Sequence, residues 1–149
     1  MIVLLRTARP FSAIVALVLL GACGNDNMSH GPVFVWPSAS SGDEMTALIK
    51  GELYVDATGC VGLITATGKF PVVWPHGTTF DPTARSIALA SGRNLQPGVI
   101  ISGGGGYIGI DGLSRVVGAD LSIPASCLPS TREVAVFNPQ AGIDIVRSP

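Results

Sequence analysis

The alternation of apolar and polar positions along this chain predicts a series of short β-strands. Leu53 and Val55 alternate with polar or amphipathic neighbours, which is the period of two expected for a strand with one buried face. Residues 60–65 form a nearly continuous apolar run, which indicates a strand that is covered on both faces. Residues 70–74 and 133–137 are the next clear strands, and a proline follows closely after each of them.

Glycine, proline and asparagine mark turns every eight to twelve residues, and residues 85–90 and 99–102 add two further strands. Asp111 and Gly112 are interpreted as a turn and residues 113–117 as a short strand, so no amphipathic helix of useful length is expected. About six short strands predict an all-β protein, a small closed or partly open barrel of the size of an OB-fold. A two-sheet β-sandwich is the alternative.

The beginning of the chain has the pattern of a secretory signal peptide. Arg6 and Arg9 precede an apolar run at residues 13–20, which is too short to span a bilayer as a helix. The sequence from Leu20 to Cys23, LGAC, resembles the lipobox of bacterial lipoproteins. That resemblance implies that Cys23 carries a diacylglyceryl group and becomes the mature N-terminus, outside the cytoplasm. The alternative is an ordinary signal peptide whose cleavage site contains a cysteine.

These patterns divide the chain into a signal peptide (1–22), a lipid-anchored flexible tether (23–45) and a small all-β domain (46–149). The tether is rich in Gly, Ser, Asn and Pro, as flexible spacers are. Its piece at residues 33–36 is too apolar for a pure linker, so we expect it to pack on the domain as an extra edge strand; the alternative is a position near the bilayer, where Trp is favoured. Residues 141–149 either add another edge strand or fray.

Chain length and net charge limit the number of domains and the classes of partner. A mature chain that begins at Cys23 retains 127 of the 149 residues, and its formal charge falls from −1 to about −3 because Arg6 and Arg9 are removed. This length suffices for one domain with a modest core. Mild acidity argues against a nucleic-acid partner, which would require a basic patch.

The three cysteines also fit an exported protein. If Cys23 carries the lipid, Cys60 and Cys127 remain as a pair in an oxidising compartment, which predicts a disulfide. This bridge would close a loop of roughly 68 residues and contribute at most about 4 kcal/mol. Two free thiols or a metal pair are the alternatives. A metal pair is disfavoured because neither cysteine has a second cysteine or a histidine at ligand spacing.

The core is similar to a family of small exported or lipid-anchored bacterial proteins, frequent in actinobacteria and without established function. The similarity covers roughly residues 47–137. It rests on Gly51 and Leu53, the stretch Gly59-Cys60-Val61 with Leu63, the stretch Val72-Val73-Trp74-Pro75 with Gly77-Thr78, the glycines 103–106 before Tyr107, and the distal Cys127. The resemblance implies a β-barrel with a disulfide, and it implies no catalytic residue.

Residues 104–109, GGGYIG, match the G-x-G-x-x-G pattern of dinucleotide sites. Such a site needs the motif after a strand and at the start of a helix, whereas β-type residues follow here. We therefore expect a strand in which a large neighbour such as Trp74 lies over bare backbone. No nucleotide or other cofactor is expected.

His76 is the most conspicuous candidate for chemistry, because it lies at a predicted corner beside Trp74 and near Asp81. A general base needs a hydrogen-bonded partner and a nearby nucleophile, and no sequence motif supports either. His76 is therefore expected to be a solvent-exposed turn residue. The other histidine, His30, lies in the tether, so the sequence predicts no metal site.

The leading hypothesis is a non-catalytic lipoprotein module outside the cytoplasmic membrane that binds an envelope protein or glycan, or supports an assembly. The predicted binding face consists of Trp74, His76, Thr78, Phe80 and Tyr107. The alternatives are a small envelope hydrolase that uses His76 with a carboxylate such as Asp81, and a carrier of a small apolar ligand inside the barrel. A hydrolase requires His76 and a carboxylate in one cleft, a carrier an apolar interior cavity, and a binding module an exposed apolar patch.

Overall fold

The computed structural model describes residues 33–38 and 44–147. The predicted signal peptide (1–22), the predicted lipidation site Cys23 and His30 lie outside the described residues. The elements of the described part are β1 (Phe34–Val35), β2 (Ala47–Val55), β3 (Val61–Thr65), β4 (Gly68–Trp74), β5 (Thr79–Asp81), β6 (Ser86–Ala88), β7 (Asn94–Leu95), β8 (Ile100–Gly109), α1 (Ile110–Val117), a 3₁₀ turn (Ala125–Cys127), β9 (Glu133–Phe137) and β10 (Ile143–Arg147).

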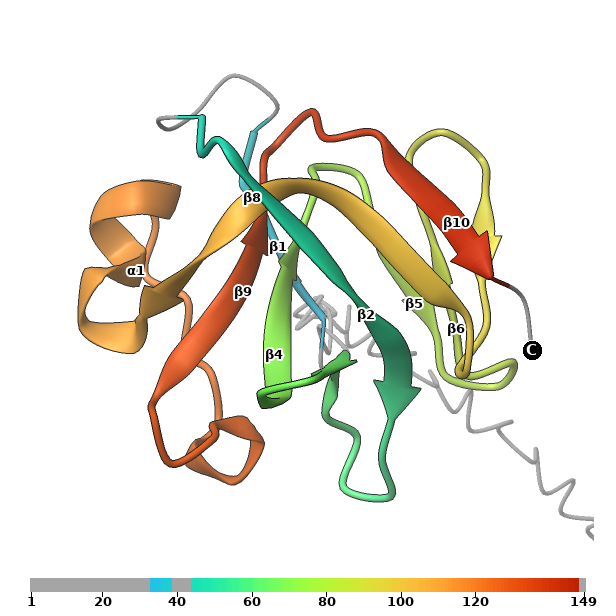
Figure 1. The fold of residues 1–149 in the computed structure, drawn as a ribbon, viewed down its shortest axis with the longest axis horizontal. Helices are drawn as coiled ribbons and strands as arrows, with labels where there is room; N and C mark the ends of the chain where they lie inside the picture. Colours follow the sequence, from blue (N-terminus) through green and yellow to red (C-terminus); the bar gives the residue numbers. More distant parts are fainter. Residues whose placement is uncertain (1–32, 39–43, 148–149) are drawn as a thin grey trace, which may run out of the picture.

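Five strands close into a barrel (Figure 1). Strands β2, β3 and β4 form an antiparallel meander, and β8 returns to pair with β2, which completes a Greek key. Strand β9 closes the ring because it pairs antiparallel with β8 and parallel with β4. A five-stranded Greek-key barrel is the architecture of the OB-fold. The predicted small all-β barrel is confirmed, and the sandwich alternative is not formed.

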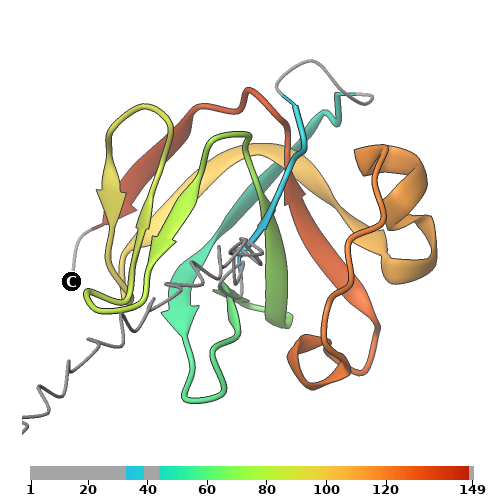
Figure 2. The same ribbon diagram turned by 180° about the vertical axis from the view of Figure 1, so that it is seen from behind.

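The barrel interior is filled by large apolar side chains. Ile49, Leu53, Leu63, Phe70 and Trp74 are each at most 5% exposed within one cluster. A barrel this small has an interior just wide enough for its own side chains. The three-stranded sheet β5–β6–β7 adds its apolar residues to the same cluster, from the side of the barrel opposite to α1 (Figures 1 and 2).

A second apolar cluster lies outside the barrel, against the parallel pair β4–β9. Val134 and Val136 of β9 belong to this outer cluster, whereas Ala135 and Phe137 belong to the inner one. Successive side chains of a strand point to opposite faces, so β9 is buried on both sides. This double burial is the physical reason for the uninterrupted apolar run in that strand.

Helix α1 covers part of the outer cluster and corrects the prediction of a turn followed by a strand. Leu113 and Val117 are four residues apart, lie on one helix face and are buried. Gly118 ends the helix with φ of 71°, and its N–H donates to the carbonyl of Ser114. Two buried residues on one face are enough for a short surface helix. The prediction of a strand at residues 113–117 did not take this spacing into account. The predicted strand at residues 99–102 was likewise too short, since β8 continues to Gly109.

The apolar piece at residues 33–36 packs on the domain as predicted. Strand β1 pairs in parallel with the end of β4 (Figure 2). Trp36 is 1% exposed, and its Nε1 donates to the carbonyl of Phe137 at 2.6 Å. The folded unit therefore begins before the domain boundary predicted at residue 46.

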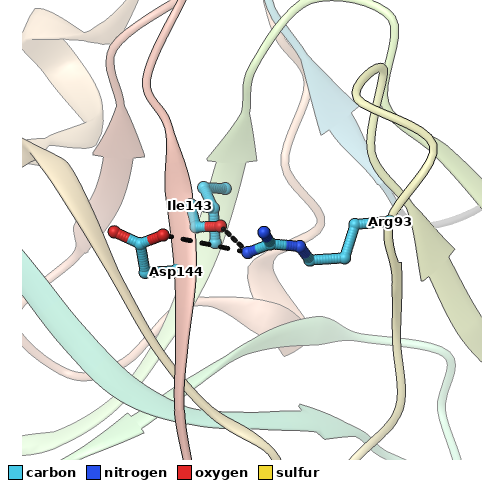
Figure 3. A network of polar contacts seen from close by, with 3 residues as sticks. All are labelled: Arg93, Ile143 and Asp144. Atoms are coloured by element: carbon cyan, nitrogen blue, oxygen red, sulfur yellow. Dashed lines mark hydrogen bonds and ion pairs between the residues drawn. The ribbon is translucent and has the colours of Figure 1, made fainter.

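Of the two alternatives for the end of the chain, residues 143–147 form the edge strand, β10, beside β8. Figure 3 shows how Arg93, just before β7, reaches across to this strand. Its Nη1 donates to the carbonyl of Ile143 at 2.8 Å and lies 3.8 Å from the carboxylate of Asp144. The exposed ion pair contributes little by itself, but together with the hydrogen bond it links the small sheet to the barrel.

Candidate functional site

The predicted binding face divides in the structure. Trp74 is completely buried and Thr78 is 5% exposed, so neither side chain is available to a partner. The hydroxyl of Thr78 donates to the carbonyl of Pro75 at 2.8 Å, and Gly77 has φ of 80°, so these residues build a tight turn. The prediction that Trp74 and Thr78 contact a partner was wrong. Their side chains are used to fold the corner.

His76 is exposed, but its ring has a structural contact. Its Nδ1 lies 3.1 Å from the carbonyl of Trp36, which can only accept, so Nδ1 carries a proton and donates. The carboxylate of Asp81 accepts from the backbone N–H groups of Thr83 and Ala84, at 2.8 and 3.0 Å, and stabilises a turn. Neither of the two ion pairs in the described part of the chain joins His76 to Asp81.

Tyr107 lies far from this corner. It pairs with Ala135 in the β8–β9 ladder, and its ring contacts Phe70 at a centroid distance of 5.0 Å. Phe70 and Trp74 are four residues apart on β4, which corresponds to roughly 13 Å. Phe80, near the corner, is half-buried against the inner cluster. The five residues of the predicted face therefore do not form one surface.

The glycine motif at residues 104–109 lies within β8, where its backbone takes part in the barrel ladders. A Cβ at Gly105 would lie 2.2 Å from the carbonyl oxygen of Val136, and one at Gly103 would lie 3.0 Å from the ring of Phe137. Close backbone approach explains these glycines, as expected, but the large neighbour is Phe137 and not Trp74. Helix α1 begins directly after the motif, contrary to the expectation that β-type residues follow.

A pocket of about 550 Å³ opens at the Phe70 end of β4. We call it the Tyr107 pocket. It is lined by residues from β2, from the β3–β4 hairpin, from β8 and from the start of β9: Lys50, Thr65, Ala66, Thr67, Phe70, Tyr107, Thr131 and Glu133. Of the predicted site residues, Tyr107 lines it. The pocket lies at the mouth of the barrel, because Phe70 belongs to the inner cluster and Tyr107 packs against it.

Four polar side chains of this pocket lack protein partners among the described residues. The hydroxyls of Tyr107 and Thr131, the ammonium group of Lys50 and the carboxylate of Glu133 make no hydrogen bond or ion pair with the described residues. Burial raises the pKa of the Tyr107 phenol, so the phenol is neutral at physiological pH and can both donate and accept. The pocket therefore offers the exposed ring of Tyr107, one positive charge, one negative charge and the free hydroxyls of Tyr107 and Thr131.

The rim of the pocket is held rigid by its own hydroxyl groups. The hydroxyl of Thr65 accepts from the backbone N–H of Thr67 at 3.1 Å, and the two hydroxyls lie 3.0 Å apart. Thr65 also donates to the carbonyl of Gly68 at 3.2 Å. These contacts stabilise the β3–β4 turn, which forms the pocket wall on this side.

The predicted disulfide is confirmed. Cys60 and Cys127 are joined with an S–S distance of 2.05 Å and a Cα–Cα distance of 5.5 Å. The bridge ties the start of β3 to the segment that leads into Thr131 and Glu133, so it restrains one wall of the Tyr107 pocket.

Asp56 organises the turn that precedes this bridge. Its carboxylate accepts from the hydroxyl of Thr58 at 2.7 Å and from the backbone N–H groups of Thr58 and Cys60 at 2.9 Å. The Thr58 hydroxyl bond is the main reason why the pKa of Asp56 lies below its usual value, and the backbone N–H groups add to the effect. Asp56 thus has a structural role in positioning Cys60.

The described residues contain no group of three or more His, Cys, Asp or Glu side chains that could hold a metal ion. Within the same residues, no helix is long and apolar enough to cross a membrane. Large exposed apolar or aromatic side chains are distributed over several strands: Leu48, Ile64, Tyr107, Ile145 and Val146.

Sequence reasoning missed Lys50, Phe70, Thr131 and Glu133 as pocket residues. These residues are spread over more than eighty positions and share no motif, so periodicity assigned each of them only to its own strand or turn. Comparisons with protein-family models, with curated proteins and with solved structures found no match for this chain. The resemblance to small actinobacterial lipoproteins therefore stays a prediction.

Proposed function

We propose that this protein is a non-catalytic binding module, anchored outside the cytoplasmic membrane by a lipid on Cys23, which binds an envelope protein or glycan through the Tyr107 pocket. The observation that carries the proposal is the concentration of unpaired polar groups around the 40%-exposed Tyr107 at the barrel mouth. Pockets that combine an apolar surface with a few convergent polar groups are the usual sites of ligand binding.

The chemistry of the pocket supports binding more than catalysis. Its titratable groups are Lys50, Tyr107 and Glu133, and none of them is hydrogen-bonded to a hydroxyl of the pocket. An activated nucleophile needs a base within hydrogen-bond reach. His76, the base of the hydrolase alternative, lies at the other end of β4 and donates to a backbone carbonyl.

The packing of the barrel supports a site at the mouth more than one inside. Ile49, Leu63, Val72, Trp74 and Phe137 fill the interior and are buried completely. A carrier of an apolar ligand needs empty, apolar space in that position. We therefore favour the binding module over the carrier.

The anchor is proposed from the sequence from Leu20 to Cys23. Two or three acyl chains on one cysteine give stable membrane association, since each buried CH₂ group contributes about 0.8 kcal/mol. We expect Cys23→Ala to move the protein from the membrane fraction to the soluble fraction, as measured by immunoblotting of fractionated cells. The matched control is Met28→Ala, which lies in the same tether and should leave fractionation unchanged. Membrane association that survives Cys23→Ala contradicts the lipid anchor.

The pocket is tested by photo-crosslinking in living cells. A photoreactive residue at Thr131 should capture a discrete partner, and the adduct should disappear in the Tyr107→Ala variant. The control probe is placed at His76, which is also exposed but lies at the opposite end of β4. A Tyr107-dependent adduct from position 131 supports the proposal. Absence of that adduct, or capture from position 76 alone, contradicts it.

A further inference from the structure

We infer that the ligand of the Tyr107 pocket is a neutral saccharide, with one pyranose ring stacked on the side chain of Tyr107. This inference rests on the proposed function and deepens it, because it names the chemical class of the ligand. Three features of the pocket carry it: a fixed aromatic ring, free hydrogen-bonding groups of both kinds, and balanced charge.

The aromatic ring is held in place before a ligand binds. Phe70 is 5% exposed and meets the ring of Tyr107 at an interplanar angle of 64°, while Tyr107 itself remains 40% exposed. The face of an aromatic ring carries negative partial charge, and the face of a pyranose presents weakly positive C–H groups. Stacking on Tyr107 therefore gains energy at a small entropic cost, since the ring has little freedom left to lose.

The free polar groups match the edge of a sugar ring. Lys50 can only donate hydrogen bonds, the carboxylate of Glu133 can only accept them, and the hydroxyls of Thr131 and Tyr107 can do both. A sugar hydroxyl both donates and accepts, so a single polyhydroxylated ligand can satisfy all four groups. Few other uncharged ligands have both an apolar face and hydroxyl groups along the whole edge of a ring.

The charge of the pocket disfavours other ligand classes. Lys50 and Glu133 both line the pocket, so an anionic ligand that is attracted by Lys50 meets repulsion from Glu133. A purely apolar ligand would remove water from both charges without replacing their hydrogen bonds, which is costly. A neutral polar ligand avoids both penalties. The volume of about 550 Å³ is in the usual range of small-ligand sites.

The test uses the full mature lipoprotein in detergent and three neutral tetrasaccharides: cellotetraose, chitotetraose and mannotetraose. Isothermal titration calorimetry should detect binding of at least one of them. Tyr107→Ala should weaken that binding at least about tenfold, whereas Tyr107→Phe keeps the ring and should stay within about threefold of the unmodified protein. Tetragalacturonate, an anionic analogue, should bind more weakly than the best neutral ligand.

Tyr54→Ala is the matched control. Tyr54 is another partly exposed tyrosine, and the ammonium group of Lys69 lies 5.4 Å from its ring centroid, but it does not line the pocket. We expect unchanged affinity in this variant. Thermal unfolding of each variant shows whether it is folded. If Tyr107→Ala does not fold, the affinity of Tyr107→Phe is the test instead. This variant keeps the aromatic ring, so a loss of affinity of more than about threefold would contradict stacking on that ring.

The outcomes separate this inference from the proposed function. If none of the three tetrasaccharides binds, or if binding survives Tyr107→Ala in a folded protein, the saccharide inference is overturned. In that case a Tyr107-dependent adduct from position 131 with a peptide or protein would still support the proposed pocket. If that adduct is also missing, both proposals fail.

Discussion

The two ends of β4 carry similar kinds of residues but use them in opposite ways. At the Trp74 end, two tryptophans are at most 1% exposed, and the carbonyl of Trp36 accepts a hydrogen bond from His76. At the Phe70 end, Tyr107 is 40% exposed, and the side chains of Lys50, Thr131 and Glu133 in the same pocket have no hydrogen-bond or ion-pair partner among the described residues. The corner that the sequence made conspicuous is structural, while the less conspicuous end is available to a ligand.

This difference shows that residue type alone is a poor guide to a binding site. Tryptophan and histidine attract attention because they are common in sites, yet here both tryptophans are buried and His76 is hydrogen-bonded to the carbonyl of Trp36. An aromatic side chain contributes to binding only where the neighbouring elements leave it partly uncovered and rigid. Three experiments examine the contrast, beginning with the one of largest expected effect.

Trp36→Ala should produce the largest loss of stability. The side chain fills the outer cluster, and its Nε1 donates to the carbonyl of Phe137, so the truncation leaves a cavity and an unpaired buried carbonyl. We expect the free energy of unfolding to fall by about 3–5 kcal/mol, measured by urea denaturation. In the fraction that stays folded, ligand binding at the other end of β4 should not change. A loss below about 1 kcal/mol would contradict a structural role for the corner.

Removal of the disulfide should have the next largest effect on stability, and it should also lower the affinity of the Tyr107 pocket. The double variant Cys60→Ser with Cys127→Ser lacks the bridge without leaving a free thiol at either position. We expect a loss of about 2–4 kcal/mol in non-reducing denaturation, because the unfolded chain gains freedom. Affinity at the Tyr107 pocket should also fall, because the segment before Thr131 is released. The unmodified protein under reducing conditions is the control, and an unchanged melting temperature in the double variant would contradict this role of the bridge.

Trp74→Phe should have the smallest effect, and Trp36→Phe is its matched control. Nε1 of Trp74 is buried and has no hydrogen-bond partner among the described residues, whereas Nε1 of Trp36 has one. Removal of an unsatisfied N–H offsets the lost packing, so we expect Trp74→Phe to change the free energy of unfolding by less than about 1 kcal/mol. Trp36→Phe leaves the carbonyl of Phe137 unpaired and should cost about 1–3 kcal/mol. The free energies of unfolding of the two variants are compared by urea denaturation. Equal losses would contradict the inference that the unsatisfied N–H of Trp74 destabilises the fold.

The predictions that succeeded from sequence were those that depend on local pattern. Period-two alternation located β2, a nearly continuous apolar run at residues 60–65 located β3, and an apolar stretch in the tether located β1. The disulfide followed from the number of cysteines and the oxidising compartment implied by the leader. The eight-residue helix α1 escaped detection, because two buried residues four positions apart are too weak a signal beside an Asp-Gly pair.

The sequence by itself determined most of the longer strands, the all-β class and the cysteine pair, because hydrophobic periodicity indicates which face of a strand is buried. It cannot state what covers that face. Only the tertiary structure decided that Trp36 is buried in the outer cluster and that Phe137 lies close to Gly103 and Gly105 of β8. It also placed Lys50, Tyr107 and Glu133 around one pocket. Burial and partnership depend on neighbours that come from distant parts of the chain, and barrel closure is the step that brings them together.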